Sequence, residues 1–425
     1  MRRYGFYILA FAFLMGQLVR IPLTFIASKN VGVTLNDLIL IILSVLLVFR
    51  GLVLGRFPFQ GAALTKPIVA FGLIAGFSLL ANIHYYDLHG SEIQTSASYL
   101  ARWLLYSMTY FFVVALVQTR EDIRIVVAVV GIALLCFAGF GIFQAIYLPN
   151  FTFMVYPDAR EYYDFDVQYS RLVSTFLDPN LAGCLIGAGL VFSISFWLAG
   201  YGKAWIPTLV FAAALILTYS RGAIVGFLLG FTYLVLVGKH RFRALIAGAA
   251  LAVIVIALVP YVLPRAEEYS RLTLSDRSSV VRVQNWLLCL DLIRENPLFG
   301  IGFDTLPFVI PRYGQVAEGA AAFGLDGGLL FIFAMTGVFG FSAYIWLIGK
   351  AMGIARSVAS RIADSFSVAL GSGCIAAALV VLTSSFFTSS LLYPHIMEFL
   401  WIAFGILEIR SRHLSTKAVP RTSAA

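Results

Sequence analysis

The sequence has little charge for its length. Only 12% of its 425 residues are charged, whereas 60% are hydrophobic. A soluble domain carries about 25% charged residues, so this chain lacks the polar surface that a protein needs when water surrounds it. The composition therefore excludes an ordinary soluble enzyme and predicts an integral membrane protein.

Cysteine is also scarce. The four cysteines show no Cys-x-x-Cys spacing; they are Cys136, Cys184, Cys289 and Cys374. Neither a disulfide framework nor a zinc site is implied by this pattern. We expect no metal ion and no cofactor.

Acidic residues are fewer than basic ones, 21 against 30, which gives a net charge of +9. The basic residues are scattered between apolar segments and do not form a stripe, so membrane topology explains them better than nucleic-acid binding does. No nucleic-acid partner is expected.

Long apolar runs are abundant. Their usual length of about 20 residues matches a helix that crosses a hydrocarbon core about 30 Å thick. We predict an all-α polytopic membrane protein with about twelve transmembrane helices. The expected helices span residues 5–27, 33–49, 67–83, 99–117, 124–148, 181–199, 205–219, 221–237, 242–263, 326–349, 364–386 and 392–409.

The loops between these helices alternate in charge. Short basic loops, for example those with Arg56 and Lys239, alternate with loops that carry acidic residues such as Asp87 and Glu268. The positive-inside rule places the basic loops and both termini in the cytoplasm. The acidic loops and any site on them are then expected on the non-cytoplasmic side.

Two acidic-side loops are long, about 149–180 and 264–325. Long loops often carry function. Within the second, residues 278–295 are expected to form a helix that Asn296-Pro297 ends, with an apolar face made of Val283, Leu287, Leu290 and Ile293. A tight turn at Gly300-Ile301-Gly302 is expected next.

Three arginines on the acidic side are candidate ligands for a phosphate ester, because the guanidinium fork binds two oxygens and stays charged. Arg221 lies in a break between two apolar helices, where a charge needs a partner or a polar cavity. Arg282 lies on the expected loop helix one turn before Trp286, and Arg171 precedes a segment that leads into a helix. A cluster of them would hold a lipid-linked diphosphate. The alternative is that each one snorkels to the interface or pairs with a nearby carboxylate.

Four stretches resemble, in the same order, motifs of the O-antigen ligase and polymerase family of bacterial membrane proteins. They are Thr-Phe-Leu-Asp-Pro-Asn-Leu-Ala at 175–182, Thr-Tyr-Ser-Arg-Gly-Ala at 218–223, Arg282 with Trp286, and Glu-Asn-Pro-Leu-Phe-Gly-Ile-Gly at 295–302. The resemblance covers about residues 170–409.

The resemblance implies a metal-independent glycosyltransferase of the GT-C type. Such a protein moves an oligosaccharide from undecaprenyl diphosphate to an acceptor hydroxyl at the periplasmic face of the bacterial inner membrane. Arginines that match Arg221 and Arg282, with Arg171 as a third candidate, would hold the diphosphate and stabilise its growing charge. The implied partners are the lipid-linked oligosaccharide, an acceptor glycan or glycolipid and the bilayer; a chain-length regulator is a further candidate.

The general base departs from the family pattern. Ligases of the family usually carry a His-Asn pair whose His lies 11 residues before the Gly that matches Gly337, and here that position is Asp326, followed by Gly327. A carboxylate also serves as a base, although Asp326 at a helix start is equally suited to an N-cap. His395, after Pro394 at the start of the last helix, is the second candidate base, and its alternative role is structural.

The missing His favours a polymerase of O-antigen or exopolysaccharide repeat units over a ligase that acts on lipid-A core. A solute transporter is a rival interpretation, but the charges lie mostly at the outward edge and no matching halves are evident. A non-catalytic scaffold is another. We expect an N-terminal membrane region over 1–170, a ligase- or polymerase-like core over 171–409 that includes the loop 264–325, and a tail over 410–425.

Overall fold

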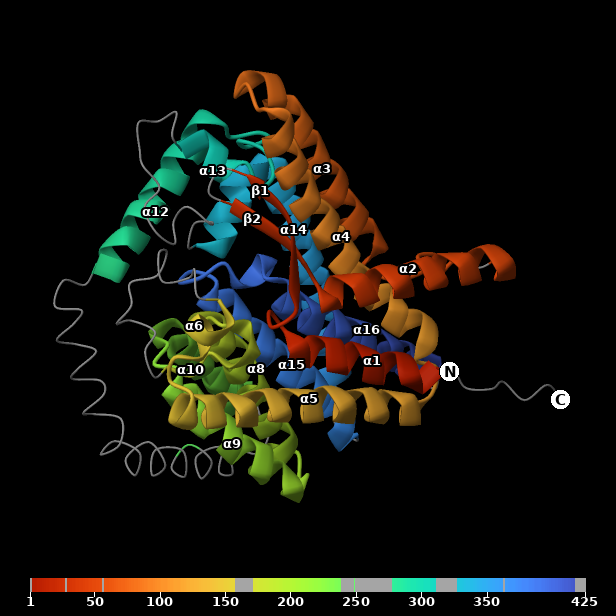
Figure 1. The fold of residues 1–425 in the computed structure, drawn as a ribbon. Coiled ribbons are helices and arrows are strands. Elements are labelled where there is room, and N and C mark those ends of the chain that lie inside the picture. The colour runs from red at the N-terminus through yellow and green to blue at the C-terminus, as the bar shows by residue number, and fades with distance from the viewer. Residues whose placement is uncertain are drawn as a thin grey trace.

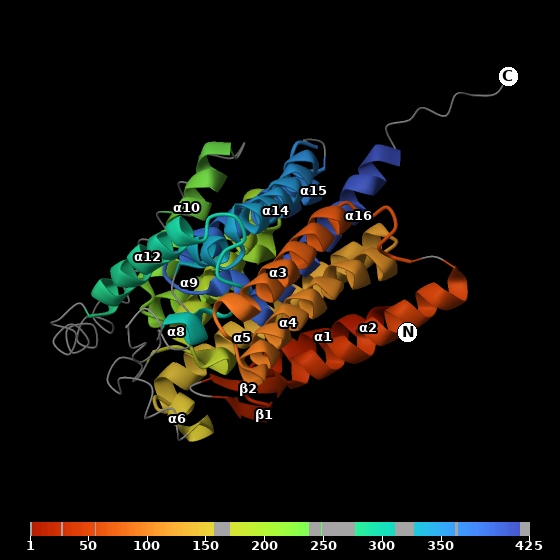
Figure 2. The same cartoon turned by 90° about the horizontal axis from the view of Figure 1, so that it is seen from above.

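A computed structural model describes the arrangement of most of the chain; the described residues are 2–26, 29–55, 57–156, 171–237, 248, 277–310, 327–361 and 364–416. They fold mainly into helices (Figure 1), most of which run in similar directions in the view of Figure 2. The strands β1 (Arg20–Ile26) and β2 (Lys29–Thr34) and the short α6 (Phe151–Val155) lie at one end of the bundle, called here the hairpin end. The end at which α16 (Pro394–Thr416) finishes is called the tail end.

Seven described helices are long and apolar enough to cross a membrane. They are α2 (Leu35–Leu54), α3 (Thr65–Tyr85), α4 (Gly90–Leu116), α5 (Arg120–Tyr147), α8 (Pro179–Leu198), α14 (Gly328–Ala359) and α15 (Ser365–Ser384). Shorter apolar helices are α1 (Arg2–Met15), α9 (Trp205–Leu217) and α10 (Arg221–Val237). A polytopic, mainly helical membrane protein is therefore confirmed.

Other parts of the expected architecture are either untested or confirmed. About twelve spans and a GT-C fold remain predictions, and the expected helix 242–263 lies outside the described residues except at Gly248. The loop helix expected over 278–295 is confirmed as α12 (Arg277–Glu295). The short α13 (Leu306–Val309) follows it.

The expected first helix, 5–27, is wrong in its second half. The helix α1 ends at Met15, and Gly16 has a left-handed φ of +52°. The amide of Gln17 then donates to the carbonyl of Thr175 at 2.8 Å, which diverts the chain. Residues 20–26 form β1 and pair antiparallel with β2. An apolar run supports either helix or strand, and here the β-branched residues and Pro22 belong to a hairpin.

The hairpin is attached to two membrane helices. Asp37 caps the start of α2 by accepting from the amide of Thr34 at 2.8 Å. The guanidinium of Arg102, on α4, forms an ion pair with Asp37 at 2.9 Å and donates to the carbonyl of Gly32 at 2.5 Å. Asp37 is only 3% exposed, so this pairing satisfies a buried carboxylate.

Small residues bring α10 very close to α15. A Cβ added at Gly226 would lie 2.8 Å from the carbonyl oxygen of Val380, and one at Gly230 would lie 2.8 Å from that of Ala376. Close approach of this kind is typical of small residues in packed membrane helices. As a result, Arg221, at the first residue of α10, lies next to the end of α15.

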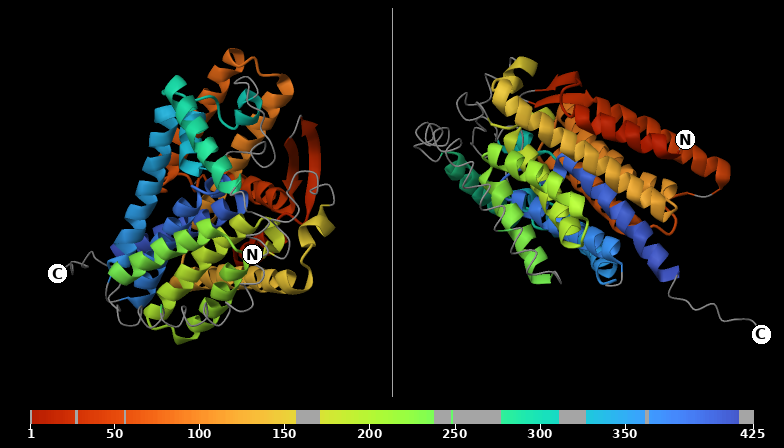
Figure 3. Two further views of the ribbon diagram at one scale, coloured as in Figure 1. Left: turned by 90° about the vertical axis from the view of Figure 1, so that its left-hand side faces the viewer. Right: turned by 90° about the horizontal axis from the view of Figure 1, so that it is seen from below.

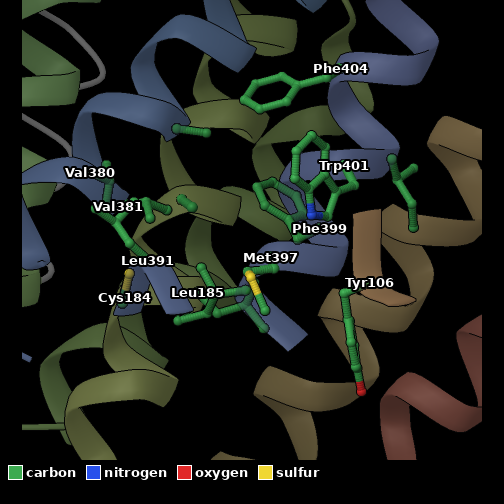
Figure 4. Close-up of a cluster of buried hydrophobic side chains, with 14 of the residues drawn as sticks. Tyr106, Cys184, Leu185, Val380, Val381, Leu391, Met397, Phe399, Trp401 and Phe404 are labelled. Atoms are coloured by element: carbon green, nitrogen blue, oxygen red, sulfur yellow. The ribbon is translucent and has the colours of Figure 1, made fainter. Parts of the chain in front are cut away.

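A large apolar core holds α8, α15 and α16 together. Leu185, Val381 and Leu391 lie near Met397 and Trp401 of α16 (Figure 4). The core fixes the position of the segment 385–393, which joins α15 to α16. That segment is central to the site described below.

The helix α14 is broken at Gly337, where the backbone has φ +63° and ψ −169°. The break is filled by the turn 297–302. The amides of Ile301 and Gly302 donate to the carbonyls of Ala334 and Met335 at 2.9 and 3.1 Å. In return, the carbonyl of Pro297 accepts from the amide of Val338 at 2.8 Å. The expected tight turn is therefore confirmed, and its partners are the backbone groups that the break exposes.

Candidate functional site

Arg221 begins α10 directly after a sharp turn. The turn needs a left-handed φ of +51° at Tyr219, and Thr218 bonds through its hydroxyl to the carbonyl of Leu215 at 2.7 Å. Arg221 is exposed, whereas its neighbour Gly222 is buried. A Cβ at Gly222 would lie 2.8 Å from the Cβ of Phe387. Gly222 therefore allows α10 to start in contact with Phe387.

Arg282 and Trp286, one turn apart on α12, also reach this segment. The Nε of Arg282 donates to the carbonyl of Phe387 at 3.2 Å, and the indole Nε1 of Trp286 donates to the carbonyl of Phe386 at 3.0 Å. The rings of Trp286 and Phe387 lie edge to face with centroids 6.3 Å apart. These contacts hold α12 against the end of α15.

A single turn, Ser385–Phe386–Phe387, connects these elements and is called here the 385–387 turn. The carbonyl of Ser385 accepts from the amide of Gly328 at 2.6 Å. The next two carbonyls accept from Trp286 and Arg282, as given above. Successive carbonyls of one turn thus hold the start of α14 and two side chains of α12, while the Phe387 side chain meets the start of α10. The structure brings Arg282 and the start of α10, where Arg221 lies, to the same turn.

The sequence reasoning missed this turn, because it assigned residues 364–386 to one helix. The sequence nevertheless contains a sign of a helix end here. Hydroxyl residues crowd the end of the apolar run, at Thr383, Ser384, Ser385, Thr388, Ser389 and Ser390. Such a cluster indicates a break.

Asp326 lies outside the described residues. Its neighbour Gly327 is described, is the N-cap residue of α14 and has φ +115°. A Cβ at Gly327 would lie 3.0 Å from Cδ1 of Trp286. Gly327 therefore packs against the same α12 side chain that bonds to the 385–387 turn.

Arg171 has a different environment, because it is only 6% exposed. Its Nε donates to the carbonyl of Thr218 at 2.9 Å, and its Nη2 lies 3.4 Å from Oδ1 of Asn180. The same Asn180 oxygen bonds to the hydroxyl of Ser220 at 3.1 Å. Arg171 thus connects the segments 175–182 and 218–223 from behind the exposed Arg221.

His395 is fully buried among aromatic rings. Its ring centroid lies 5.9 Å from that of Phe13, 5.0 Å from Phe176 and 5.5 Å from Tyr393. Neither ring nitrogen has a hydrogen-bond partner within the described part of the chain. The imidazole is thus closed off from solvent in this arrangement, and its described ring contacts are to Phe13, Phe176 and Tyr393.

The described residues thus form a polytopic helical membrane protein in which Arg282 and the helix start that carries Arg221 contact one turn. Residues 206–345 match the model of a family described as O-antigen ligase. The family resemblance seen in the sequence is confirmed over this region, which includes Arg221, Arg282, α12 and the break in α14. Arg171 and His395 lie outside it. A search of curated proteins found no match.

Proposed function

We propose that the protein is a membrane glycosyltransferase that moves a lipid-linked oligosaccharide onto an acceptor hydroxyl at the hairpin end. The observation that carries this proposal is that Arg282 and the start of α10, which carries the exposed Arg221, both contact the 385–387 turn, within the region that matches the O-antigen ligase family. Guanidinium groups from two helices suit a diphosphate, which carries several oxygens and more than one negative charge.

The proposed donor is undecaprenyl diphosphate-linked oligosaccharide, and its lipid tail remains in the bilayer. The acceptor oxygen forms a bond to the anomeric carbon while the bond from that carbon to the diphosphate oxygen breaks. The electron pair of the broken bond stays on undecaprenyl diphosphate, where Arg221 and Arg282 stabilise the added charge. A single displacement of this kind inverts the anomeric configuration.

Asp326 is the proposed base that receives the proton of the acceptor hydroxyl. Its support is the position of Gly327, the next residue, which packs against Trp286 beside the 385–387 turn. A carboxylate suits proton abstraction from a sugar hydroxyl. His395 is the weaker candidate because it is fully buried among aromatic rings.

Arg171 is proposed as a positioning residue. It is buried and bonds to the carbonyl of Thr218 and to Asn180. Its contacts fix the turn that precedes Arg221, so it acts on the diphosphate through that turn.

The proposed acceptor is a growing chain of repeat units, which makes the protein a polymerase of O-antigen or exopolysaccharide in the bacterial inner membrane, with the hairpin end facing the periplasm. The absence of the usual His of the ligases supports this choice. Ligation to lipid-A core is the second candidate, favoured by the description of the matching family.

The test is a transfer assay with the purified full-length protein in proteoliposomes. The substrate is an undecaprenyl diphosphate-linked repeat unit from the native host, offered alone or with lipid-A core, and products are separated on a gel. A ladder without added acceptor supports polymerisation. Product only with lipid-A core supports ligation. If neither condition gives transfer, while solute uptake by the same vesicles is measurable, the glycosyltransferase proposal is wrong and the transporter interpretation replaces it.

A further inference from the structure

The helix α12 carries an exposed apolar stripe that the proposed chemistry does not use. Val283 is 49% exposed, Leu287 is 56% exposed and Leu290 is 38% exposed. Their spacing of four and three residues places them on one side of the helix. A different side carries the buried Asn285, Cys289 and Leu292. The stripe is therefore an outward face of a helix whose other side is already packed.

Both ends of α12 are attached to the hairpin ends of membrane helices. Near its start, Arg282 and Trp286 bond to the 385–387 turn, which follows α15. After its end, Nδ2 of Asn296 donates to the hydroxyl of Tyr86, the residue that follows α3, at 3.0 Å. Consequently α12 lies at the level where the spanning helices leave the hydrocarbon region; its position next to α14 is visible in Figure 3, where α12 is teal and α14 is light blue.

The apolar surface continues from α12 onto helices of membrane-spanning length. Leu298, just beyond α12, is 54% exposed. Phe299 packs against Phe77 of α3, with ring centroids 4.8 Å apart, and against Phe339 of α14 at 5.2 Å. Phe77 and Phe339 are themselves 53% and 48% exposed. Exposed apolar side chains on spanning helices face lipid, so the surface that α12 adjoins is a lipid-facing one.

We propose that α12 is an interfacial helix whose stripe of Val283, Leu287 and Leu290 contacts lipid in the leaflet at the hairpin end. Polar residues border the stripe as such a helix requires. Gln284 and Asp291, at one edge of the stripe, are exposed, and Arg294, which continues the stripe four residues after Leu290, is exposed and pairs with Asp291 at 3.0 Å. A long arginine side chain next to an apolar stripe reaches the headgroup phosphates.

This placement deepens the proposed function, and it rests on that function where it takes Arg282 as a ligand of the diphosphate. Arg282 immediately precedes Val283 on the same helix. Contact between the stripe and lipid sets Arg282 at the depth of the headgroups, where the diphosphate of a lipid-linked donor lies. The lipid surface would thus position the arginine for a membrane-anchored substrate.

The experiment uses nitroxide labels on single cysteines in the full chain, in vesicles of phosphatidylethanolamine and phosphatidylglycerol. Cys136→Ser removes the exposed thiol among the described residues; Cys184, Cys289 and Cys374 are buried. One cysteine is then introduced per protein and labelled. It replaces Leu287 or Leu290 on the stripe, or Gln284 or Asp291 on the polar border as a matched control. Collision rates with lipid-soluble oxygen and with a water-soluble nickel chelate are compared. Circular dichroism and size-exclusion profiles check that each labelled protein is folded.

Labels on the stripe are expected to meet oxygen more often than the nickel chelate, and those on the polar border to show the reverse. A stripe that meets the nickel chelate as often as the border does would overturn the proposal. So would a stripe that meets neither reagent, because protein would then cover it. The labelling experiment needs no catalysis, so the two proposals can fail separately. Lipid contact by the stripe in a protein that gives no glycosyl transfer would contradict the proposed function and still support α12 as an interfacial helix.

Discussion

Arginine is held differently at the tail end and around the 385–387 turn of the hairpin end. At the tail end, Arg410 is 2% exposed and bonds to Asp364 and to the hydroxyl of Ser367. At the hairpin end, Arg221 is exposed, and the partly buried Arg282 donates to a backbone carbonyl. Removing one partner of an enclosed arginine–carboxylate pair destabilises the fold, because the other charge is left buried without a partner. An accessible arginine at a turn shared by several helices can also receive a ligand.

The tail end shows the same enclosure at a second carboxylate. Glu408 is 3% exposed and accepts from the amide of Ala63 at 2.9 Å, from the hydroxyl of Tyr110 and from Arg412 at 2.5 Å. These bonds satisfy the buried carboxylate. They also hold the loop before α3 against the end of α16. The comparison indicates that Arg410 and Glu408 are enclosed at the tail end, whereas Arg221 at the hairpin end is accessible.

The largest effect is expected from the hairpin-end arginines. Changing Arg221→Gln or Arg282→Gln should each lower glycosyl transfer by about 100-fold, the usual loss when one preorganised donor to a developing charge is removed. The rate is measured with the lipid-linked repeat unit in proteoliposomes. The protein should remain folded, because Arg221 is exposed and Arg282 contributes one described bond to a carbonyl.

Arg294→Gln is the matched control for Arg282→Gln, since Arg294 lies on the same helix and its side chain is 76% exposed. Its transfer rate should stay near that of the wild type. Full transfer by folded Arg221→Gln and Arg282→Gln proteins would contradict the proposal that the hairpin-end arginines act in transfer and those of the tail end do not.

The break in α14 gives the next effect. Gly337→Ala should lower the free energy of unfolding by about 3 kcal/mol, because an alanine meets left-handed strain and overpacking together. The added Cβ would overlap the backbone of Leu298 and Phe299. The measurement is unfolding in mixed micelles. Gly349→Ala, in the same helix with open space around it, should be neutral or slightly stabilising; equal losses for both variants would contradict the account of the break.

At the tail end, Asp364→Asn should cost about 2 kcal/mol of unfolding free energy, less than a fully buried pair because the Asp364 side chain is 30% exposed. Transfer per folded molecule should be unchanged. Asp291→Asn breaks an exposed pair on α12 and should cost less than about 1 kcal/mol. A selective loss of transfer in Asp364→Asn would show that the tail end also takes part in function.

The smallest effect is expected from Trp286→Phe, which keeps an aromatic ring but removes the N–H that donates to the carbonyl of Phe386. Losing one such bond costs about 1 kcal/mol, so transfer should fall roughly fivefold through a less well-positioned Arg282. Trp205→Phe, at an exposed site on α9, is the control. No difference between the two variants would mean that the bond to the 385–387 turn does not position α12.

The sequence by itself determined the membrane class, most of the helices and the arginines worth testing. Apolar runs of spanning length predict membrane helices because the bilayer sets that length, and α12 followed from its 3.6-residue pattern and its Asn-Pro stop. The turn at Gly300-Ile301-Gly302 was also predicted, since glycines mark tight turns. These are local properties, so they can be read without knowing what packs nearby.

Only the tertiary structure decided how these parts meet. The helix α1 stops at Met15, where the chain meets Thr175 through the amide of Gln17, and β1 and β2 pair beyond that point. All three arginines were candidate phosphate ligands in sequence, with Arg171 the third of them, but the sequence could not tell that Arg171 is buried while Arg221 is exposed. The 385–387 turn gathers α12 and α14 through backbone carbonyls, which every residue type has, and meets α10 through the side chain of Phe387. Burial and long-range partners depend on contacts between distant segments, and for that reason local sequence could not supply them.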